Sequence, residues 1–203
     1  MEKFAFYDFD DTLLKHDSMG HLYLYYLKKH PWMCYRAVLL AFKTLLYRLN
    51  WIDFLKVKEE LIYPISQMTD DELKTFYTDD LIPRYYPHVL ETLKKHAQEG
   101  FHVWLVSASP EPYLFCTDLP LEKIIGTKVE RKQDRWTNHI ISKNCKREEK
   151  VVRIQEELEK MNLIIDYEKS YAYSDSESDL PMLKLVKNRI RINKKNGEMS
   201  PFV

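Results

Sequence analysis

The stretch that decides the fold is Phe4-Ala5-Phe6-Tyr7-Asp8-Phe9-Asp10-Asp11-Thr12, an apolar run that ends in three acids. A short apolar run bounded by polar residues is typical of a strand buried on both faces. Residues two apart on an extended segment point the same way, so Asp8 and Asp10 share one side. Such a pair can hold a hard cation, or one acid can attack while the other transfers protons. An Asp-rich turn after a strand is the alternative, and these residues alone leave both open.

Working outward, the chain alternates strand and helix patterns. Further strands are predicted over 103–106, 170–173 and 189–192, and helices between them over 88–98, 148–161 and 178–187. This alternation predicts an α/β protein with a Rossmann-like parallel sheet, in which ligands bind at the carboxyl ends of the strands. Polar clusters follow Tyr7, Val106 and Tyr173, each at the end of a predicted strand. We therefore expect one site at that edge of the sheet.

The segment between the first two strands is too long for a simple crossover. Helical patterns fill it, over 21–29, 32–50, 53–62 and 69–77. The sequence therefore predicts an all-helical cap over residues 15–82, inserted after the first strand. An α/β core would be formed by residues 1–14 and 83–203, with a hairpin over 128–142.

Composition narrows the class of protein. The 203 residues include 31 basic and 31 acidic ones, and this balance argues against a nucleic-acid partner bound through bulk charge. The cysteines Cys34, Cys116 and Cys145 lack metal or redox spacing and fit free thiols in a reducing compartment. The N-terminus lacks the features of a secretory signal. We expect a cytoplasmic protein.

Other polar groups at predicted strand ends and helix starts can complete a site. The Ser107 hydroxyl and the Ala108 amide, expected at a helix start, suit a phosphate oxygen. Lys150 can offset charge on a phosphoryl group, and Asp175 and Asp179 can ligate magnesium or position the lysine. Each has an ordinary alternative, as a helix cap, an exposed lysine or a helix-start acid. The ordered combination is much more specific than any part.

That order resembles the haloacid dehalogenase superfamily of phosphatases, in the branch with phosphoserine phosphatases and a helical cap after the first strand. The resemblance spans essentially the whole chain. The matching motifs are Asp8-Phe9-Asp10-Asp11-Thr12-Leu13, Val106-Ser107-Ala108-Ser109, Asn144-Cys145 through Lys150, and Tyr173-Ser174-Asp175-Ser176-Glu177-Ser178-Asp179. The resemblance implies a magnesium-dependent phosphomonoester hydrolase that works through an aspartyl-phosphate.

The resemblance also implies a role for each acid. Asp8 would be the nucleophile and a magnesium ligand. Asp10 would be general acid and then base, and would bind the metal through its backbone carbonyl. Asp175 would be a further metal ligand, while Asp179 and Thr12 would support the site.

Phosphate would be held by Ser107, Ala108 and Lys150. Lys146 is the rival for the lysine role, but the family's lysine follows a short polar loop where a helix begins, and this favours Lys150. Asp17 stands where phosphoserine phosphatases commonly place an acid for the substrate's amino group.

Three residues depart from the family pattern, since Asp11, Arg147 and Ser174 stand where glycine is usual. Asp11 adds negative charge near the expected phosphate unless it points away. All the essential side chains are present, which favours an active enzyme.

The cap sequence bears on the substrate. The stretch from Trp32 to Arg48 is strongly apolar, but Arg36, Lys43 and Arg48 argue against a full membrane span. It fits either an interfacial helix on anionic lipid, or a helix packed in the cap core or a dimer interface.

A closer resemblance is to phosphatidylglycerophosphate phosphatases of the same superfamily. It rests on the segments Lys28-Lys29-His30-Pro31, Ser109-Pro110-Glu111-Pro112, Ser174-Asp175-Ser176 and Arg189-Ile190-Arg191-Ile192-Asn193. It implies a lipid phosphate substrate and peripheral contact at the inner face of the membrane. The alternatives are a soluble small-metabolite phosphatase, such as one for phosphoserine, and a membrane-associated binding protein that keeps the fold.

Overall fold

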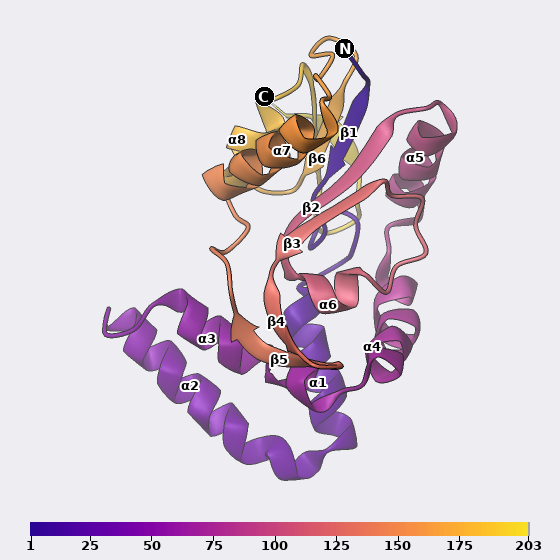
Figure 1. Ribbon diagram of the computed structural model, residues 1–203. Helices are drawn as coiled ribbons and strands as arrows, with labels where there is room; N and C mark the ends of the chain where they lie inside the picture. The colour runs from indigo at the N-terminus through magenta and orange to yellow at the C-terminus, as the bar shows by residue number, and fades with distance from the viewer. Residues whose placement is uncertain (203) are drawn as a thin grey trace.

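The computed structural model describes residues 1–202 and contains a six-stranded sheet in the order β3-β2-β1-β6-β7-β8 (Figure 1). Neighbouring strands pair in parallel, except that β8 is antiparallel to β7. Its strands are β1 (Phe4–Tyr7), β2 (His102–Pro110), β3 (Lys123–Thr127), β6 (Tyr171–Ser174), β7 (Asn188–Ile192) and β8 (Met199–Pro201). The predicted α/β class with a mostly parallel sheet is confirmed.

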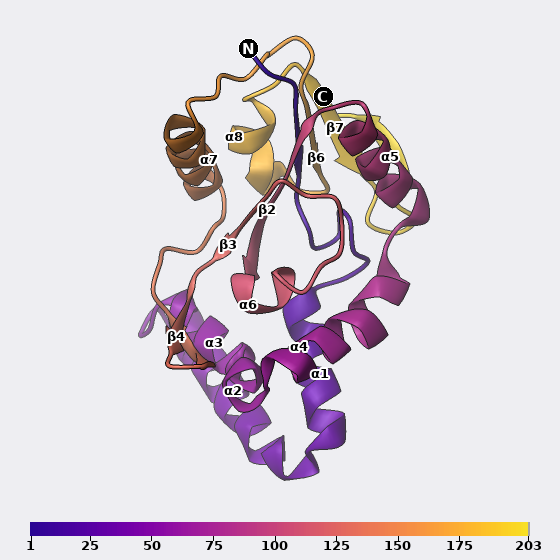
Figure 2. The same ribbon diagram turned by 45° about the vertical axis from the view of Figure 1, so that its right-hand side comes forward.

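Helices cover both faces of the sheet (Figure 2). On one face, Ala5 and Tyr7 of β1 share a core with Val89 and Leu93 of α5 (Pro87–Gln98). On the other, Phe4 and Phe6 belong to the core formed with α7 (Glu148–Met161) and α8 (Leu180–Leu183). Burial on both faces explains why β1 is a continuous apolar run.

A helical insertion follows β1, as predicted, and lies below the sheet in Figure 1. We call it the cap. Its helices are α1 (Ser18–Lys29), α2 (Cys34–Arg48), α3 (Phe54–Leu61) and α4 (Asp70–Phe76), with 3-10 turns at Pro31–Met33 and Tyr63–Gln67. Helix α1 begins three residues before its predicted start, because the Asp17 carboxylate accepts the Gly20 N–H at 3.0 Å and caps it.

The predicted hairpin is also present, with β4 (Val129–Lys132) antiparallel to β5 (Arg135–Ile140). It lies against the cap, where the Asn138 amide donates to the Glu59 carbonyl at 2.8 Å. Arg131 forms an ion pair with Asp70 of α4 at 2.7 Å. The hairpin, which comes from the second half of the chain, therefore packs against the cap.

Some elements differ from those predicted. Strands β3 and β8 and the short helix α6 (Glu111–Leu114) were not predicted. Strand β2 continues to Pro110, so Ser107 lies in a strand and the expected helix start after it is wrong. Helix α8 ends at Leu183, earlier than predicted, because the chain must reach Asn188, where β7 pairs with β6.

Helix α2 is exposed for most of its circumference. It contacts the cap core through Ala37 and Leu40, whereas Val38 is 72% exposed and Phe42 is 55% exposed. Between residues 1 and 202 there is no helix with both the length and the apolarity needed to cross a bilayer.

Candidate active site

The carboxyl ends of β1, β2 and β6 face the cap, and a cavity of about 270 Å³ lies there. Every predicted site residue except Thr12 lines it: Asp8, Asp10, Asp17, Ser107, Ala108, Lys150, Asp175 and Asp179. The chain thus brings together side chains that are up to 171 positions apart in the sequence, from Asp8 to Asp179.

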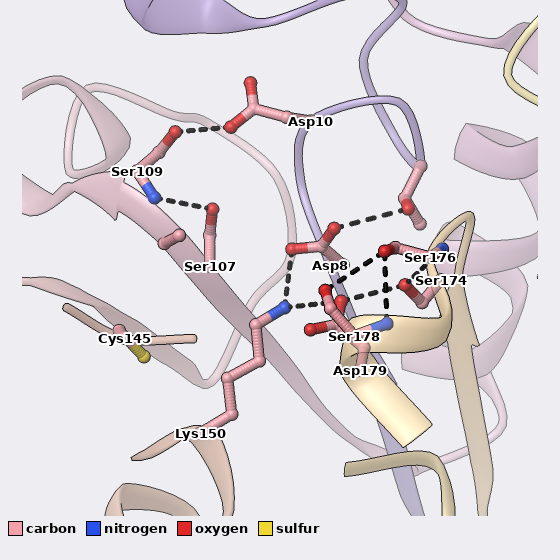
Figure 3. A network of polar contacts seen from close by, with 12 residues as sticks. Asp8, Asp10, Ser107, Ser109, Cys145, Lys150, Ser174, Ser176, Ser178 and Asp179 are labelled. Atoms are coloured by element: carbon pink, nitrogen blue, oxygen red, sulfur yellow. Dashed lines mark hydrogen bonds and ion pairs between the residues drawn. The ribbon is translucent and has the colours of Figure 1, made fainter. Parts of the chain in front are cut away.

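Asp8 directly follows β1, and its N–H donates to the Tyr173 carbonyl of β6 at 3.1 Å. Its carboxylate accepts from the Lys150 ammonium at 2.7 Å and from the Thr12 hydroxyl at 3.5 Å (Figure 3). The same hydroxyl accepts the Asp175 N–H at 3.0 Å. Thr12 therefore lies outside the cavity lining but links two of the predicted metal ligands.

Lys150 is buried and joins two carboxylates, donating to Asp8 at 2.7 Å and to Asp179 at 2.8 Å. Asp179 is held in turn by the Ser174 hydroxyl at 2.8 Å. Burial alone would lower the pKa of Lys150, but the two carboxylates outweigh burial and raise its pKa above the usual value. Lys146 also lines the cavity, but Lys150 is the lysine that bonds to Asp8.

Asp10 points to a network shared by the cap and the core. Its carboxylate accepts the Ser18 N–H, at the start of α1, at 2.6 Å and the hydroxyl of Ser109. Ser18 and Ser109 also bond to each other at 2.9 Å, and Ser18 bonds to the Tyr113 hydroxyl at 2.7 Å. Burial and the nearby charge of Asp17 raise the pKa of Asp10 to about 6, against the lowering effect of these hydrogen bonds.

The acids suit a hard divalent cation. Burial, with repulsion from Asp179 and Asp10, raises the pKa of Asp8 to about 7, although Lys150 opposes this shift. Burial and the charges of Asp11 and Asp179 also raise the pKa of Asp175. A cation beside Asp8 and Asp175 would relieve this repulsion, and oxygen ligands are those that magnesium prefers.

Such a site would use two carboxylates, the Asp10 carbonyl and water. Residues 1–202 contain no group of three His, Cys, Asp or Glu side chains that could hold a metal by themselves. Magnesium commonly keeps several waters and binds through one or two carboxylates, so the donor set still fits it.

The residues that replace the family's glycines have identifiable local functions. Asp11 has a φ of 55°, and its carboxylate accepts the His16 N–H at 3.0 Å, so the side chain closes the loop after β1. Arg147 has a φ of 56° just before α7, again a glycine-like backbone. Ser174 supplies the hydroxyl that holds Asp179.

Sequence reasoning gave no role to several residues that also line the cavity, among them Met19, Phe54, Lys58 and Asn144, the last of which begins one of the matching motifs. Lys58 is the least expected, since it is 1% exposed. A signal was present, because positions 54, 57, 58 and 61 have the i, i+3, i+4, i+7 spacing of a buried helix face. Lys58 is the one charged residue in that series.

Two known phosphatases are similar to this chain in sequence. A histidinol-phosphatase of Neisseria meningitidis serogroup C is 28% identical over 95% of this chain and 91% of its own length. A phosphoserine phosphatase of Mycobacterium tuberculosis is 27% identical over 93% of this chain, which spans 64% of that protein. The phosphatase class expected from the sequence agrees with both names.

Solved structures share the fold. A Bordetella pertussis protein of unknown function has a TM-score of 0.78 at 23% identity, covering 95% of this chain and 90% of its own. A substrate-bound phosphoserine phosphatase has a TM-score of 0.62 at 14% identity, covering 95% and 86%. The model of the haloacid dehalogenase-like hydrolase family matches residues 5–184. This chain belongs to the haloacid dehalogenase-like hydrolase family.

Proposed function

We propose that this protein is a magnesium-dependent phosphomonoesterase that forms an aspartyl-phosphate on Asp8 and acts on a small phosphate ester carrying a positive charge. The main support for this proposal is the position of the Asp8 carboxylate at the end of β1. It is held by Lys150 and Thr12 and faces a cavity that Ser107 and Asp10 also line. A positioned carboxylate is a known nucleophile toward phosphorus.

Each side chain of the site has a separate role in the proposed reaction. Asp8 attacks phosphorus in line, and Asp10 protonates the leaving oxygen, after which Asp10 takes a proton from the water that cleaves the acyl-phosphate. A raised pKa suits Asp10 to this exchange near neutral pH. Lys150, the Ser107 hydroxyl and the Ala108 amide face the phosphoryl oxygens and offset their charge. Magnesium held by Asp8, Asp175 and the Asp10 carbonyl would supply further charge stabilisation.

The side of the cavity formed by the cap favours a cationic leaving group. It consists of Asp17, Met19, Phe54 and Lys58. Lys58 directs its donors to oxygens of the protein, so Asp17 supplies the charge that the cap presents. Histidinol phosphate carries an amine and an imidazole but no carboxylate, whereas phosphoserine carries a carboxylate. The cavity and the named Neisseria relative therefore both support an amine such as histidinol phosphate.

A lipid phosphate such as phosphatidylglycerophosphate is the second candidate. Phe54 lines the cavity and is 40% exposed, and Leu49 and Trp51, in the segment that leads to it, are 51% and 75% exposed. An apolar surface that reaches the cavity would suit an acyl chain near the membrane interface. Cytoplasmic location and contact with the inner face of the membrane stay predictions.

One assay tests the activity and separates the substrates. Phosphate release should require magnesium, stop with EDTA and return when magnesium is restored. We expect Asp8→Asn to lower kcat by at least about 10³-fold, because the nucleophile is lost. Histidinol phosphate should be turned over with a higher kcat/KM than phosphoserine or dispersed phosphatidylglycerophosphate.

Unchanged turnover in the Asp8→Asn protein would contradict the aspartyl-phosphate mechanism. A preference for phosphatidylglycerophosphate would favour the lipid substrate over the amine. A preference for phosphoserine would contradict both proposed substrates. Circular dichroism of Asp8→Asn checks that the variant is folded.

A further inference from the structure

Lys58 of α3 reaches from the cap into the core. Its ammonium donates to the Ala108 carbonyl at 2.5 Å, the Asn144 side-chain oxygen at 2.6 Å and the Thr127 hydroxyl at 2.9 Å. An ammonium has three N–H donors, and these three bonds use all of them. The side chain is therefore fully committed to the protein while the cap lies in this position.

The oxygens that Lys58 binds belong to the segments that we assign to phosphate. Ala108 adjoins Ser107 on β2, and Asn144 begins the loop that leads to Lys150 on α7. Thr127 connects them, since its hydroxyl lies 2.6 Å from the Ala108 carbonyl and accepts the Cys145 N–H at 3.3 Å. Without the cation, the Ala108 carbonyl and the Asn144 oxygen would share the Thr127 hydroxyl, whose one hydrogen can be donated to only one of them at a time.

Burying this charge costs free energy that an apolar side chain would not. Lys58 has no carboxylate among its hydrogen-bond partners within residues 1–202, and desolvation lowers its pKa to about 8. An isolated buried charge is strongly unfavourable unless hydrogen bonds compensate. Simple packing of α3 on the core would be served better by methionine or leucine.

We propose that Lys58 is a positioning residue that organises the two phosphate-binding segments only when the cap is closed over them. The proposal rests on the phosphatase activity proposed above. Withdrawal of α3 removes the ammonium from all three oxygens at once, so the Ala108 peptide and the Asn144 loop lose the cation that they share and keep only their link through Thr127. Closure of the cap is thereby coupled to assembly of the site, which keeps water away from an incomplete catalytic arrangement.

The test compares Lys58→Met with Lys58→Arg and with Lys56→Met as the matched control. Lys56 is on the same helix, is 59% exposed and pairs with Glu59. We expect Lys58→Met to lower kcat/KM by about 10- to 100-fold, the size of a small displacement of catalytic groups. Lys58→Arg should restore part of the loss, and Lys56→Met should stay within about twofold of the wild type.

The dependence on substrate separates positioning from direct substrate binding. A positioning residue should give the same fold loss with histidinol phosphate, phosphoserine and p-nitrophenyl phosphate, and it should raise the Ki of inorganic phosphate. A loss confined to phosphoserine would overturn the proposal, because Lys58 would then be binding the substrate carboxylate. Full activity of Lys58→Met would also overturn it.

A second substitution guards against a folding defect. Thr127→Val removes one acceptor of Lys58, together with the bonds of this hydroxyl to Ala108 and Cys145, with little change of shape. We expect it to raise the Ki of inorganic phosphate in the same direction as Lys58→Met. An unchanged Ki in folded Thr127→Val protein would overturn the proposal. An inactive wild type would instead refute the proposed function, so the two failures can be told apart.

Discussion

Asp11 occupies a backbone conformation that costs most side chains free energy. Its φ of 55° lies in the left-handed region, which glycine enters freely and aspartate tolerates better than alanine. The hydrogen bond from the His16 N–H to the carboxylate adds a local reason for an acceptor at this position. The hydrogen bond to the Asp11 side chain thus helps to offset the cost of holding a residue other than glycine in this backbone conformation.

Substitutions at Asp11 can separate the effect of its charge from the effects of its hydrogen bond and backbone conformation. We expect Asp11→Ala to lower the free energy of unfolding by about 1 to 2 kcal/mol, through the lost hydrogen bond and the left-handed backbone. Asp11→Asn keeps an acceptor and tolerates the same φ, so it should stay within about 0.5 kcal/mol of the wild type. Urea unfolding without magnesium measures both, and equal stability of Asp11→Ala and wild type would refute this account.

At the residue scale, the sequence located the polar groups that follow buried apolar runs. Asp8, Ser107 and Asp175 each follow or end a buried apolar run, and parallel strands carry them to one edge of the sheet. Their catalytic roles stay predictions. Lys58 could not be found in this way, because only the tertiary position of α3 shows that a charged residue on its buried face meets Ala108 and Asn144.

At the scale of elements, α2 depends on a buried carboxylate for its attachment. Glu60 of α3 is 1% exposed and bonds to both Arg36 and Lys43 of α2 at 2.7 Å. The Arg36 guanidinium also stacks over the Tyr63 ring at 3.4 Å. Since α2 has no fully buried residue, these bonds add to the partly buried packing of Ala37 and Leu40 in attaching the helix.

We expect Glu60→Gln to loosen α2 without unfolding the sheet. Removing one partner of a buried ion pair typically costs about 3 to 5 kcal/mol. The cost should be lower here because the Arg36 and Lys43 side chains are 17% and 28% exposed. Hydrogen exchange should accelerate over residues 34–48 and stay unchanged in β1 and β2. Glu157→Gln, whose partners Lys123 and Lys160 are partly exposed, is the control and should cost less than about 1 kcal/mol. Unchanged protection of α2 would contradict the role of Glu60.

The elements that could be predicted are those with a strong periodic pattern. Strand β1 is a continuous apolar run, and the helices α5 and α7 are apolar at regular spacing, so their positions followed from the sequence. All three residues of β8 are exposed, and β3 offers only two adjacent large apolar residues, so neither sequence has the apolar pattern of a buried strand. The contact of the hairpin with the cap depends on tertiary ion pairs such as that of Arg131 and Asp70.

For the whole molecule, a buried histidine connects stability to pH. His96 of α5 is 7% exposed, bonds to the Tyr173 hydroxyl at 2.9 Å, and its Nδ1 has no partner within residues 1–202. Burial, aided by Lys95 and Lys3, lowers the pKa of His96 below 6.5. Below pH 6.5 the unfolded chain therefore binds more protons at this site than the folded one, and stability falls as pH falls toward the folded pKa.

His96→Gln should reduce this pH dependence while retaining a hydrogen-bonding group near Tyr173. We expect the difference in unfolding free energy between wild type and variant to be largest at pH 7.5 and smaller at pH 5.5. Urea unfolding of both proteins at the two pH values measures it. A His96→Gln difference that grows on acidification would reverse the sign and refute the assignment.

The hairpin's contact with the cap has a mechanical consequence. The cap and the hairpin are connected to the core by four stretches of chain. Residues 8–17 and 82–86 connect the cap, and residues 127–128 and 141–147 connect the hairpin. Tethers at several points resist a wide swing and favour a slight rocking movement. A shift of about 1 Å already takes a hydrogen bond outside its normal range, so rocking alone can release the ammonium of Lys58 from its oxygens. Forming and releasing the Lys58 contacts would therefore need only a small movement of the cap and the hairpin.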